Sequence, residues 1–185
     1  MRTLILKEAV GRERMEEVMR GMGLTLAKDD TVEQMAWRIW MAADRQSAVH
    51  DIDDFVTKVR YLSVRGKKEG ALVKQLSAAL PIWTRDDLLK HALDLLGNGS
   101  DEDRQRAAFE VAAEMDEYDA ASAGVLTAFL KMDEPGSRRA GARALRSRPW
   151  SIFRGTAQQL STDADPEIAA VGKEMLARII EQHGE

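Results

Sequence analysis

The chain of 185 residues contains no cysteine. This absence excludes disulfide bonds, thiolate metal ligands and thiol nucleophiles together. It is typical of a reducing compartment, and we therefore expect a cytoplasmic protein.

Long apolar runs and a strong charge of one sign are also missing. No window holds the roughly 18–20 consecutive apolar residues of a membrane span, and Lys7 and Glu8 interrupt the first apolar residues, so we expect neither a signal peptide nor a membrane anchor. The formal net charge of −4 gives no general argument for nucleic acid or for an anionic membrane surface.

Aromatic residues make up only 5% of the chain, whereas alanine and leucine are abundant. This composition favours helices over a sandwich or barrel. A hydrophobic content of 44% beside 31% charged residues is typical of a soluble globular protein. The length predicts a single domain over residues 1–185.

Three similar stretches dominate the second half of the sequence. Each opens on an acidic residue, continues through charged or small residues and ends in an apolar run rich in small side chains, and they start at Asp101, Glu134 and Asp165. The starts lie 33 and 31 residues apart. A repeat of about 32 residues is typical of stacked helix pairs, because neighbouring pairs bury the apolar face that one pair leaves open.

These units contain a recognisable pattern of acid, proline, hydrophobe, arginine and small residues. Asp165-Pro166-Glu167-Ile168 matches its opening, Arg138-Arg139-Ala140 its centre, and Arg106-Ala107-Ala108 the same centre less fully. The pattern resembles HEAT-type repeats, in particular the short bacterial kind related to phycobilisome-lyase repeats, over residues 101–180 and from residue 69 if the preceding unit is counted. The resemblance implies a solenoid of helix pairs, and it implies no specific activity because such folds serve many unrelated partners.

Apolar spacing and capping residues predict helices along the whole chain. Asp30 and Glu33 have the spacing of a capping box, and an apolar stripe follows them at helical intervals: Val32, Met35, Ala36, Ile39, Trp40 and Ala43. The expected helices cover residues 6–22, 31–47, 55–62, 85–96, 101–115, 119–132, 135–147, 149–160 and 166–183. We therefore predict an all-α fold, an α-solenoid of about four stacked antiparallel helix pairs over residues 69–185 with an N-terminal helical cap over residues 1–68.

Catalytic candidates are few. Asp87 and His91 have the spacing of a carboxylate–imidazole pair on one helix, and we interpret them as a surface or capping pair. His50 with Asp51, Asp53 and Asp54 lacks the glycine and the distal glutamate of a calcium loop, so we interpret these acids as the start of a helix. No nucleophile elbow, phosphate loop or dinucleotide fingerprint is present. We expect no enzyme activity, no metal and no cofactor.

A basic run is the main candidate for binding. Residues 135–162 hold six arginines and no acid, and Trp150 lies among them. The arginines are expected either to bridge adjacent helix pairs, to acids such as Glu110 or Asp133, or to bind an acidic protein or nucleic acid. The candidate partner-binding residues are Arg138, Arg139, Arg143, Arg146, Trp150 and Arg154.

Two tryptophans, Trp83 and Trp150, each begin a second helix of a predicted pair. They either seal the gap between helices or form binding anchors at one edge. The function that we predict is a non-enzymatic scaffold or adaptor that binds an acidic protein on its concave or basic face. The alternative is a nucleic-acid-binding protein that uses the Arg138–Arg154 surface.

Overall fold

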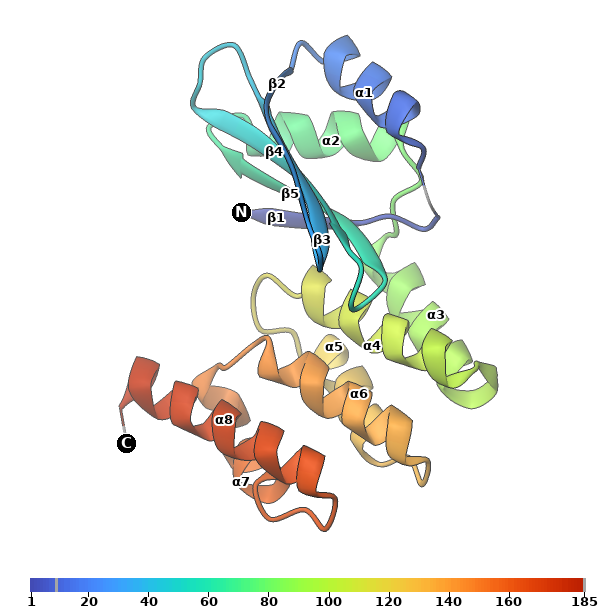
Figure 1. Ribbon diagram of the computed structural model, residues 1–185, viewed down its shortest axis with the longest axis vertical. Helices are drawn as coiled ribbons and strands as arrows, with labels where there is room; N and C mark the ends of the chain where they lie inside the picture. Colours follow the sequence, from blue (N-terminus) through green and yellow to red (C-terminus); the bar gives the residue numbers. More distant parts are fainter. Residues whose placement is uncertain (9, 185) are drawn as a thin grey trace. The chain divides into compact units, whose positions relative to one another are not determined.

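The protein consists of two compact units. A computed structural model describes residues 1–8 and 10–184 (Figure 1). We call the first the sheet unit and the second the helical unit; they comprise Met1–Leu88 with Ala113–Glu117, and Leu89–Ala112 with Tyr118–Glu185.

The sheet unit is built on a five-stranded antiparallel sheet in the order β1-β5-β4-β3-β2. Its strands are β1 (Arg2–Ile5), β2 (Thr25–Val32), β3 (Met35–Met41), β4 (Ser47–Asp54) and β5 (Val59–Gly66). Two helices, α1 (Arg12–Gly21) and α2 (Glu69–Ala79), lie on one side of this sheet (Figure 1).

The core of the sheet unit lies between this face of the sheet and the two helices. Alternate strand residues point to one face, and they meet apolar residues that recur at helical spacing along α1 and α2. The buried side chains include Trp40, Val49, Leu62 and Val64 from the strands, Met15, Val18 and Met19 from α1, and Leu72 and Leu76 from α2.

The predicted all-α fold is therefore wrong, because residues 25–66 form strands rather than helices. The stripe from Val32 to Ala43 arises because both faces of β3 carry apolar side chains. Trp40 points into the core, whereas Trp37 and Ile39 lie on the opposite face. Two apolar faces at period two produce some of the same spacings as one helical face at period 3.6.

The N-terminal helical cap over residues 1–68 is also wrong. Asp30 and Glu33, interpreted as a capping box, lie on β2 and in its turn to β3. Residues 55–62, predicted as a helix, form the β4–β5 turn and the start of β5, and the expected helix 6–22 is reduced to α1. An α-solenoid does not extend through the whole chain.

In the second half of the chain, the bounds of the predicted helices are confirmed to within a few residues. They are α3 (Arg85–Asn98), α4 (Asp101–Glu114), α5 (Ala120–Leu130), α6 (Pro135–Arg146), the 3₁₀ turn η1 (Ser151–Phe153), α7 (Arg154–Leu160) and α8 (Pro166–His183). Side chains of Asp119, Glu134 and Asp165 accept backbone N–H groups at the starts of α5, α6 and α8. These caps satisfy donors that a helix start otherwise leaves unpaired.

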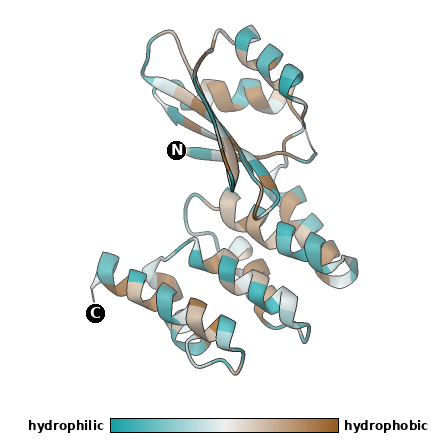
Figure 2. Cartoon of the chain, viewed as in Figure 1, coloured by the Kyte–Doolittle hydropathy of each residue, from teal (hydrophilic) through white to brown (hydrophobic). Residues whose placement is uncertain are grey.

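Close helix packing in the helical unit depends on two glycines. A methyl group added at Gly141 of α6 would lie 2.8 Å from the Cβ of Phe129 in α5, and one at Gly172 of α8 would lie 2.5 Å from the Leu160 carbonyl carbon. Neither helix has room for a larger residue there. Figure 2 shows hydrophilic and hydrophobic segments alternating along α6 and α8, as amphipathic packing requires. Among the described residues, no helix is both long and apolar enough to cross a membrane.

A buried ion-pair triad lies on the helix-covered face of the sheet. Asp51 of β4 is only 1% exposed and lies opposite Arg38 of β3, whose Nη2 is 2.8 Å from its Oδ2. Arg60 of β5 approaches the same carboxylate at 3.4 Å and also donates to the carbonyl of Val10. One carboxylate therefore balances two guanidinium groups in a region of low solvent access.

Replacing Asp51 by Asn should destabilise the sheet unit by about 3–5 kcal/mol, because two buried cations lose their shared counter-charge. Urea unfolding followed by tryptophan fluorescence measures the change, with the exposed Glu33→Gln variant as control. An Asp51→Asn variant as stable as the wild type would show that the triad does not stabilise the fold.

Candidate protein-interaction surface

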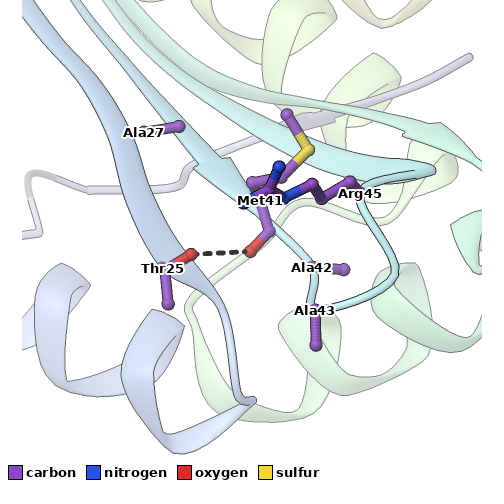
Figure 3. A pocket seen from close by; sticks show the side chains of 6 residues that line it. All are labelled: Thr25, Ala27, Met41, Ala42, Ala43 and Arg45. Carbon is purple, nitrogen blue, oxygen red and sulfur yellow. Dashed lines mark hydrogen bonds between the residues drawn. The ribbon is translucent and has the colours of Figure 1, made fainter.

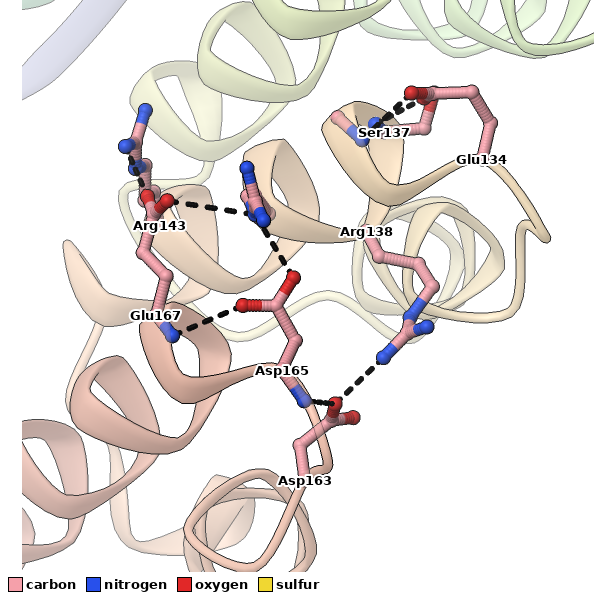
Figure 4. Close-up of polar contacts among 9 residues, drawn as sticks. Glu134, Ser137, Arg138, Arg143, Asp163, Asp165 and Glu167 are labelled. Atoms are coloured by element: carbon pink, nitrogen blue, oxygen red, sulfur yellow. Dashed lines mark hydrogen bonds and ion pairs between the residues drawn. The ribbon is translucent and has the colours of Figure 1, made fainter.

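Four of the candidate arginines on α6 form a ladder of ion pairs with α8 and with the turn before it. Figure 4 shows Arg138 and Arg143 of this ladder together with Asp163, Asp165 and Glu167. Arg138 lies 2.6 Å from Asp163, Arg139 lies 2.9 Å from Asp165, and Arg146 lies 2.8 Å from Glu174. Arg143 pairs with Glu167, which also receives Arg139 at 3.4 Å. We call these eight residues the arginine ladder.

The electrostatics of the ladder follow from helix geometry. Its arginines lie on the side of α6 that faces α8, whose capping acid is Asp165. The hydrogen bond and the charge of Asp165 raise the pKa of Arg139. Burial alone would raise the pKa of Asp165, but hydrogen bonds from Arg139 and from the backbone N–H of Glu167 outweigh it and lower that pKa. The carboxylates at the start of α8 also suit the positive end of the helix dipole.

The sequence did not decide whether these basic residues bridge helices or bind a partner. In the structure, four of them bridge α6 to α8 and to the turn before it. The bridging acids are Asp163, Asp165, Glu167 and Glu174, not Glu110 or Asp133 as suggested by the sequence. Their carboxylates balance the charge of the four arginines locally. The remaining candidates, Trp150 and Arg154, lie outside the ladder.

Trp150 belongs to an aromatic cluster around η1. Its ring stacks on Phe153 with centroids 5.9 Å apart and 15° between planes, and Phe153 meets Tyr118 edge-on at 6.1 Å. Tyr118 is 48% exposed and Ile152 is 57% exposed, whereas Phe153 is buried beneath them. We call Tyr118, Trp150, Ile152 and Phe153 the aromatic edge.

Two arginines flank Trp150 along the chain. Arg154 donates to the carbonyl of Gly184, and Arg148 donates through Nε to the carbonyl of Ala112 at 2.7 Å. The guanidinium of Arg148 also lies 5.9 Å from the centre of the Trp150 ring.

Sequence reasoning missed Tyr118 and Ile152. The regular spacing of Ile152, Phe153, Ala157 and Leu160 suggested one continuous packing face on a helix from residue 149. The helix is instead preceded by η1, and this tighter turn leaves Ile152 outside the packing face. The dipeptide Pro149-Trp150 was a signal for such an irregular start.

Trp83 has a different setting from Trp150. It belongs to the sheet unit, where its backbone N–H donates to the carbonyl of Ile5 and the ammonium of Lys7 lies 4.9 Å from its ring centre. The two tryptophans are therefore not equivalent positions of a repeat.

The catalytic candidates form no reaction centre. Thr84 caps the start of α3, because its hydroxyl oxygen accepts the backbone N–H of Asp87, and the same hydroxyl donates to the Asp87 carboxylate. Asp51 and His50 lie on opposite faces of β4 and do not begin a helix. Trp37 donates to His50 Nδ1 at 3.3 Å, and burial, with the charge of Arg65, lowers the pKa of His50. No group of three potential metal-binding side chains occurs in the described residues.

An open hollow of about 430 Å³ lies at one end of β2 and β3 (Figure 3). Its lining consists of Thr25, Ala27, Met41, Ala42, Ala43 and Arg45. The Thr25 hydroxyl is already engaged with the Met41 carbonyl. Mostly small apolar side chains with one cation do not provide the converging polar groups of an active site.

Comparison with known proteins supplies no template for this geometry: no protein-family model, no curated protein and no solved structure matches the chain. The assignment of a site therefore depends on the side chains themselves.

Glu110 of α4 is a buried carboxyl group whose pKa is strongly raised. It is 6% exposed, its Oε1 lies 3.8 Å from Arg106, and its Oε2 is buried without a hydrogen bond. Burial raises its pKa to about 7, against the opposing effect of Arg106. Carboxyl groups that titrate near neutrality are common at functional sites. For Glu110, the raised pKa makes the stability of the fold depend on pH.

The Glu110→Gln variant should show a different dependence of stability on pH. Because the folded state holds the Glu110 proton more tightly than the unfolded state, the contribution of Glu110 to stability falls as pH rises from about 4.5 to 7, and this loss then levels off. The difference between wild type and variant should shift by roughly 2–3 kcal/mol across that window, measured by urea unfolding at each pH. The exposed Glu102→Gln variant should follow the wild type; parallel profiles for wild type and Glu110→Gln would contradict the expectation.

Proposed function

We propose that the protein is a non-enzymatic interaction module that binds another protein through the aromatic edge of its helical unit. One observation carries the proposal: Tyr118 and Ile152 are exposed, and Tyr118 meets edge-on the buried Phe153 ring on which Trp150 stacks. Exposed apolar side chains that lie against buried aromatic packing are costly to leave in water, and such a surface is typical of a binding site.

The chemistry of the edge fits a protein partner. Aromatic residues and arginine are enriched at protein interfaces, where they supply large contact area with few rotatable bonds. The stack restricts Trp150 before any partner binds, so less conformational entropy is lost on binding. Arg154 follows Phe153 in the chain and favours a carboxylate on the partner there, whereas Glu117 precedes Tyr118 and favours a cation.

Binding of nucleic acid by the Arg138–Arg154 surface is the weaker alternative. Binding to phosphates requires several cations that exchange their counterions for the ligand. In the arginine ladder, carboxylates of the same chain already serve as those counterions. A nucleic acid would have to displace Asp163, Asp165 and Glu167 from arginines that they contact directly.

The resemblance to HEAT-type repeats remains a prediction for residues 101–180. It favours a binding role, because helical repeats commonly present exposed surfaces to partners. The concave face of a four-pair solenoid is not part of the proposal, because α2, which was expected to begin the array, packs in the core of the sheet unit.

Replacing Ile152 by Glu should abolish partner capture without unfolding the protein, because the side chain is exposed and a charge there opposes apolar contact. Purified wild type and variant are used to capture proteins from source-cell lysate with and without nuclease, and circular dichroism verifies folding. The matched control is Ile180→Glu, an exposed isoleucine on α8 outside the edge.

The expected result is a nuclease-resistant protein that binds wild type and Ile180→Glu but not Ile152→Glu. If Ile152→Glu captures as much of the partner as wild type does, the binding site lies elsewhere. Loss of all captured material after nuclease treatment would favour nucleic acid.

A further inference from the structure

The sheet ends on one side at β2, and the outer edge of this strand is open. The strand order places β2 beyond β3, with no strand further out. In the part of the chain that the structure describes, the backbone of residues 25–32 bonds to no element except β3. The side chains of β2 are exposed, apart from the half-buried Asp30. An open edge of this kind presents unpaired N–H and C=O groups to an extended chain that lies beside it.

The hollow of about 430 Å³ shown in Figure 3 lies at the Thr25 end of this edge. Four of the side chains that line it are apolar: Ala27, Met41, Ala42 and Ala43. The Thr25 hydroxyl already donates to the Met41 carbonyl, so Arg45 is the remaining polar side chain of the lining. The hollow therefore has room for an apolar side chain beside a cation.

Arg45 belongs to a β3–β4 turn that is held in shape. Its φ of 53° lies in the left-handed region, and its backbone N–H donates to the carbonyl of Ala42 at 2.9 Å. Asp44 Oδ1 accepts the backbone N–H of Gln46 at 3.0 Å. The Asp44 carboxylate also pairs with Lys68 at 3.3 Å. Among the described residues, no carboxylate lies within ion-pair distance of the Arg45 guanidinium, which leaves this cation available to a ligand.

The charges around the hollow favour an anionic group. The β3–β4 turn and the segment bonded to it, residues 42–47 and 66–68, carry three cations against Asp44, namely Arg45, Lys67 and Lys68. The next acids along the chain and along β2 have cations of their own: Glu69 pairs with the amino group of Met1 at 2.8 Å, Asp30 with Lys28 at 3.2 Å and Asp29 with Arg12 at 2.5 Å. A carboxylate at Arg45 thus meets a net positive charge.

The same edge is protected against unselective pairing. Ala27 interrupts the register between β2 and β3 and so forms a bulge, and the charged residues Lys28, Asp29 and Asp30 follow it. Bulges and charges on an edge strand limit its pairing with arbitrary strands. A chain that docks on β2 must therefore gain more than backbone hydrogen bonds, and the hollow with Arg45 provides that gain.

We propose that β2 and the hollow bind the carboxyl end of an extended partner chain, which adds a strand to the sheet. β2 runs from Thr25 to Val32, so a chain that ends at Thr25 runs antiparallel to it, as the other neighbouring strands of the sheet do. The last side chain of the partner, an apolar one, enters the hollow. Its terminal carboxylate accepts hydrogen bonds from the Arg45 guanidinium. This surface is separate from the aromatic edge, because it lies in the sheet unit.

An array of synthetic decapeptides tests the site. The peptides end in alanine, valine, isoleucine or leucine, vary in the preceding residues, and are each made as a free acid and as a C-terminal amide. Binding to the full chain, measured by fluorescence polarisation, should favour free acids by about tenfold or more, because an amide forms no ion pair with Arg45. Methylation of alternate backbone N–H groups in the peptides that bind should abolish binding, because strand addition depends on main-chain hydrogen bonds.

The Arg45→Asn variant tests the protein side of the contact. Asparagine tolerates the left-handed region, so the turn is retained while the cation is lost. Lys58→Asn is the matched control, because it removes a cation at a φ of 59° in the β4–β5 turn. The free-acid peptides should bind Arg45→Asn about tenfold more weakly than wild type. They should bind Lys58→Asn and Ile152→Glu as tightly as wild type.

The inference is wrong if no peptide of the array binds, or if Arg45→Asn binds the free acids as tightly as wild type does. Equal binding of acids and amides would assign the edge to an internal segment of a partner. Loss of peptide binding in Ile152→Glu would place the peptide on the aromatic edge. Dimers of wild type that exclude the peptides would assign the open edge of β2 to a second copy of the chain. Each of these results leaves the proposed function of the aromatic edge to its own test.

Discussion

The pairing of arginines on α6 with carboxylates at the start of α8 determines how the helical unit can be used. The ladder links residues about 25 positions apart in the chain and orients α8 as it leaves its cap. Gly172 allows α8 to lie against the end of α7 without a clash. Because the ladder supplies its own counter-charges, the most basic part of the sequence is not the most attractive surface for an anion. Two of the exposed apolar side chains of this unit, Tyr118 and Ile152, belong to the aromatic edge.

In the sheet unit, charged side chains also pair with one another, but there the pairing is buried. Its polar centre is the buried pairing of Asp51 with two arginines, and its apolar core lies between the sheet and two helices. Arg38 and Asp51 lie two residues along their strands from Trp40 and Val49, so charged and apolar side chains share the same buried layer beneath the helices.

The sequence predicted the helices after residue 85 because several local signals agree there. Acidic caps, proline in the first turn and alanine-rich faces all indicate helices, and the glycine in α6 marks a close approach. The strands were missed because Met35, Ile39 and Trp40 fit a helical stripe as well as they fit a strand. Alternation in β5, together with β-branched and aromatic residues between positions 31 and 64, was the signal for strands.

Only part of the candidate site could be predicted from the sequence. The basic run and Trp150 are local features of the sequence, and both proved to have defined structural roles. Whether an arginine bridges or binds depends on carboxylates some 25 residues away, which spacing alone does not pair. The exposure of Ile152 depends on η1, a single irregular turn that periodicity cannot foresee. Tyr118 enters the cluster only through its contact with Phe153.

The most direct test of the account is a charge-swap cycle on the Arg143–Glu167 pair, read out by the thermal unfolding midpoint. If the ladder is structural, Arg143→Glu and Glu167→Arg should each lower the midpoint, and the double swap should recover part of the loss because opposite charges again face each other. Partner capture through Ile152 should survive the double swap. Single variants with unchanged midpoints, combined with loss of partner capture in Arg143→Glu, would contradict the account and make the basic face itself the binding surface.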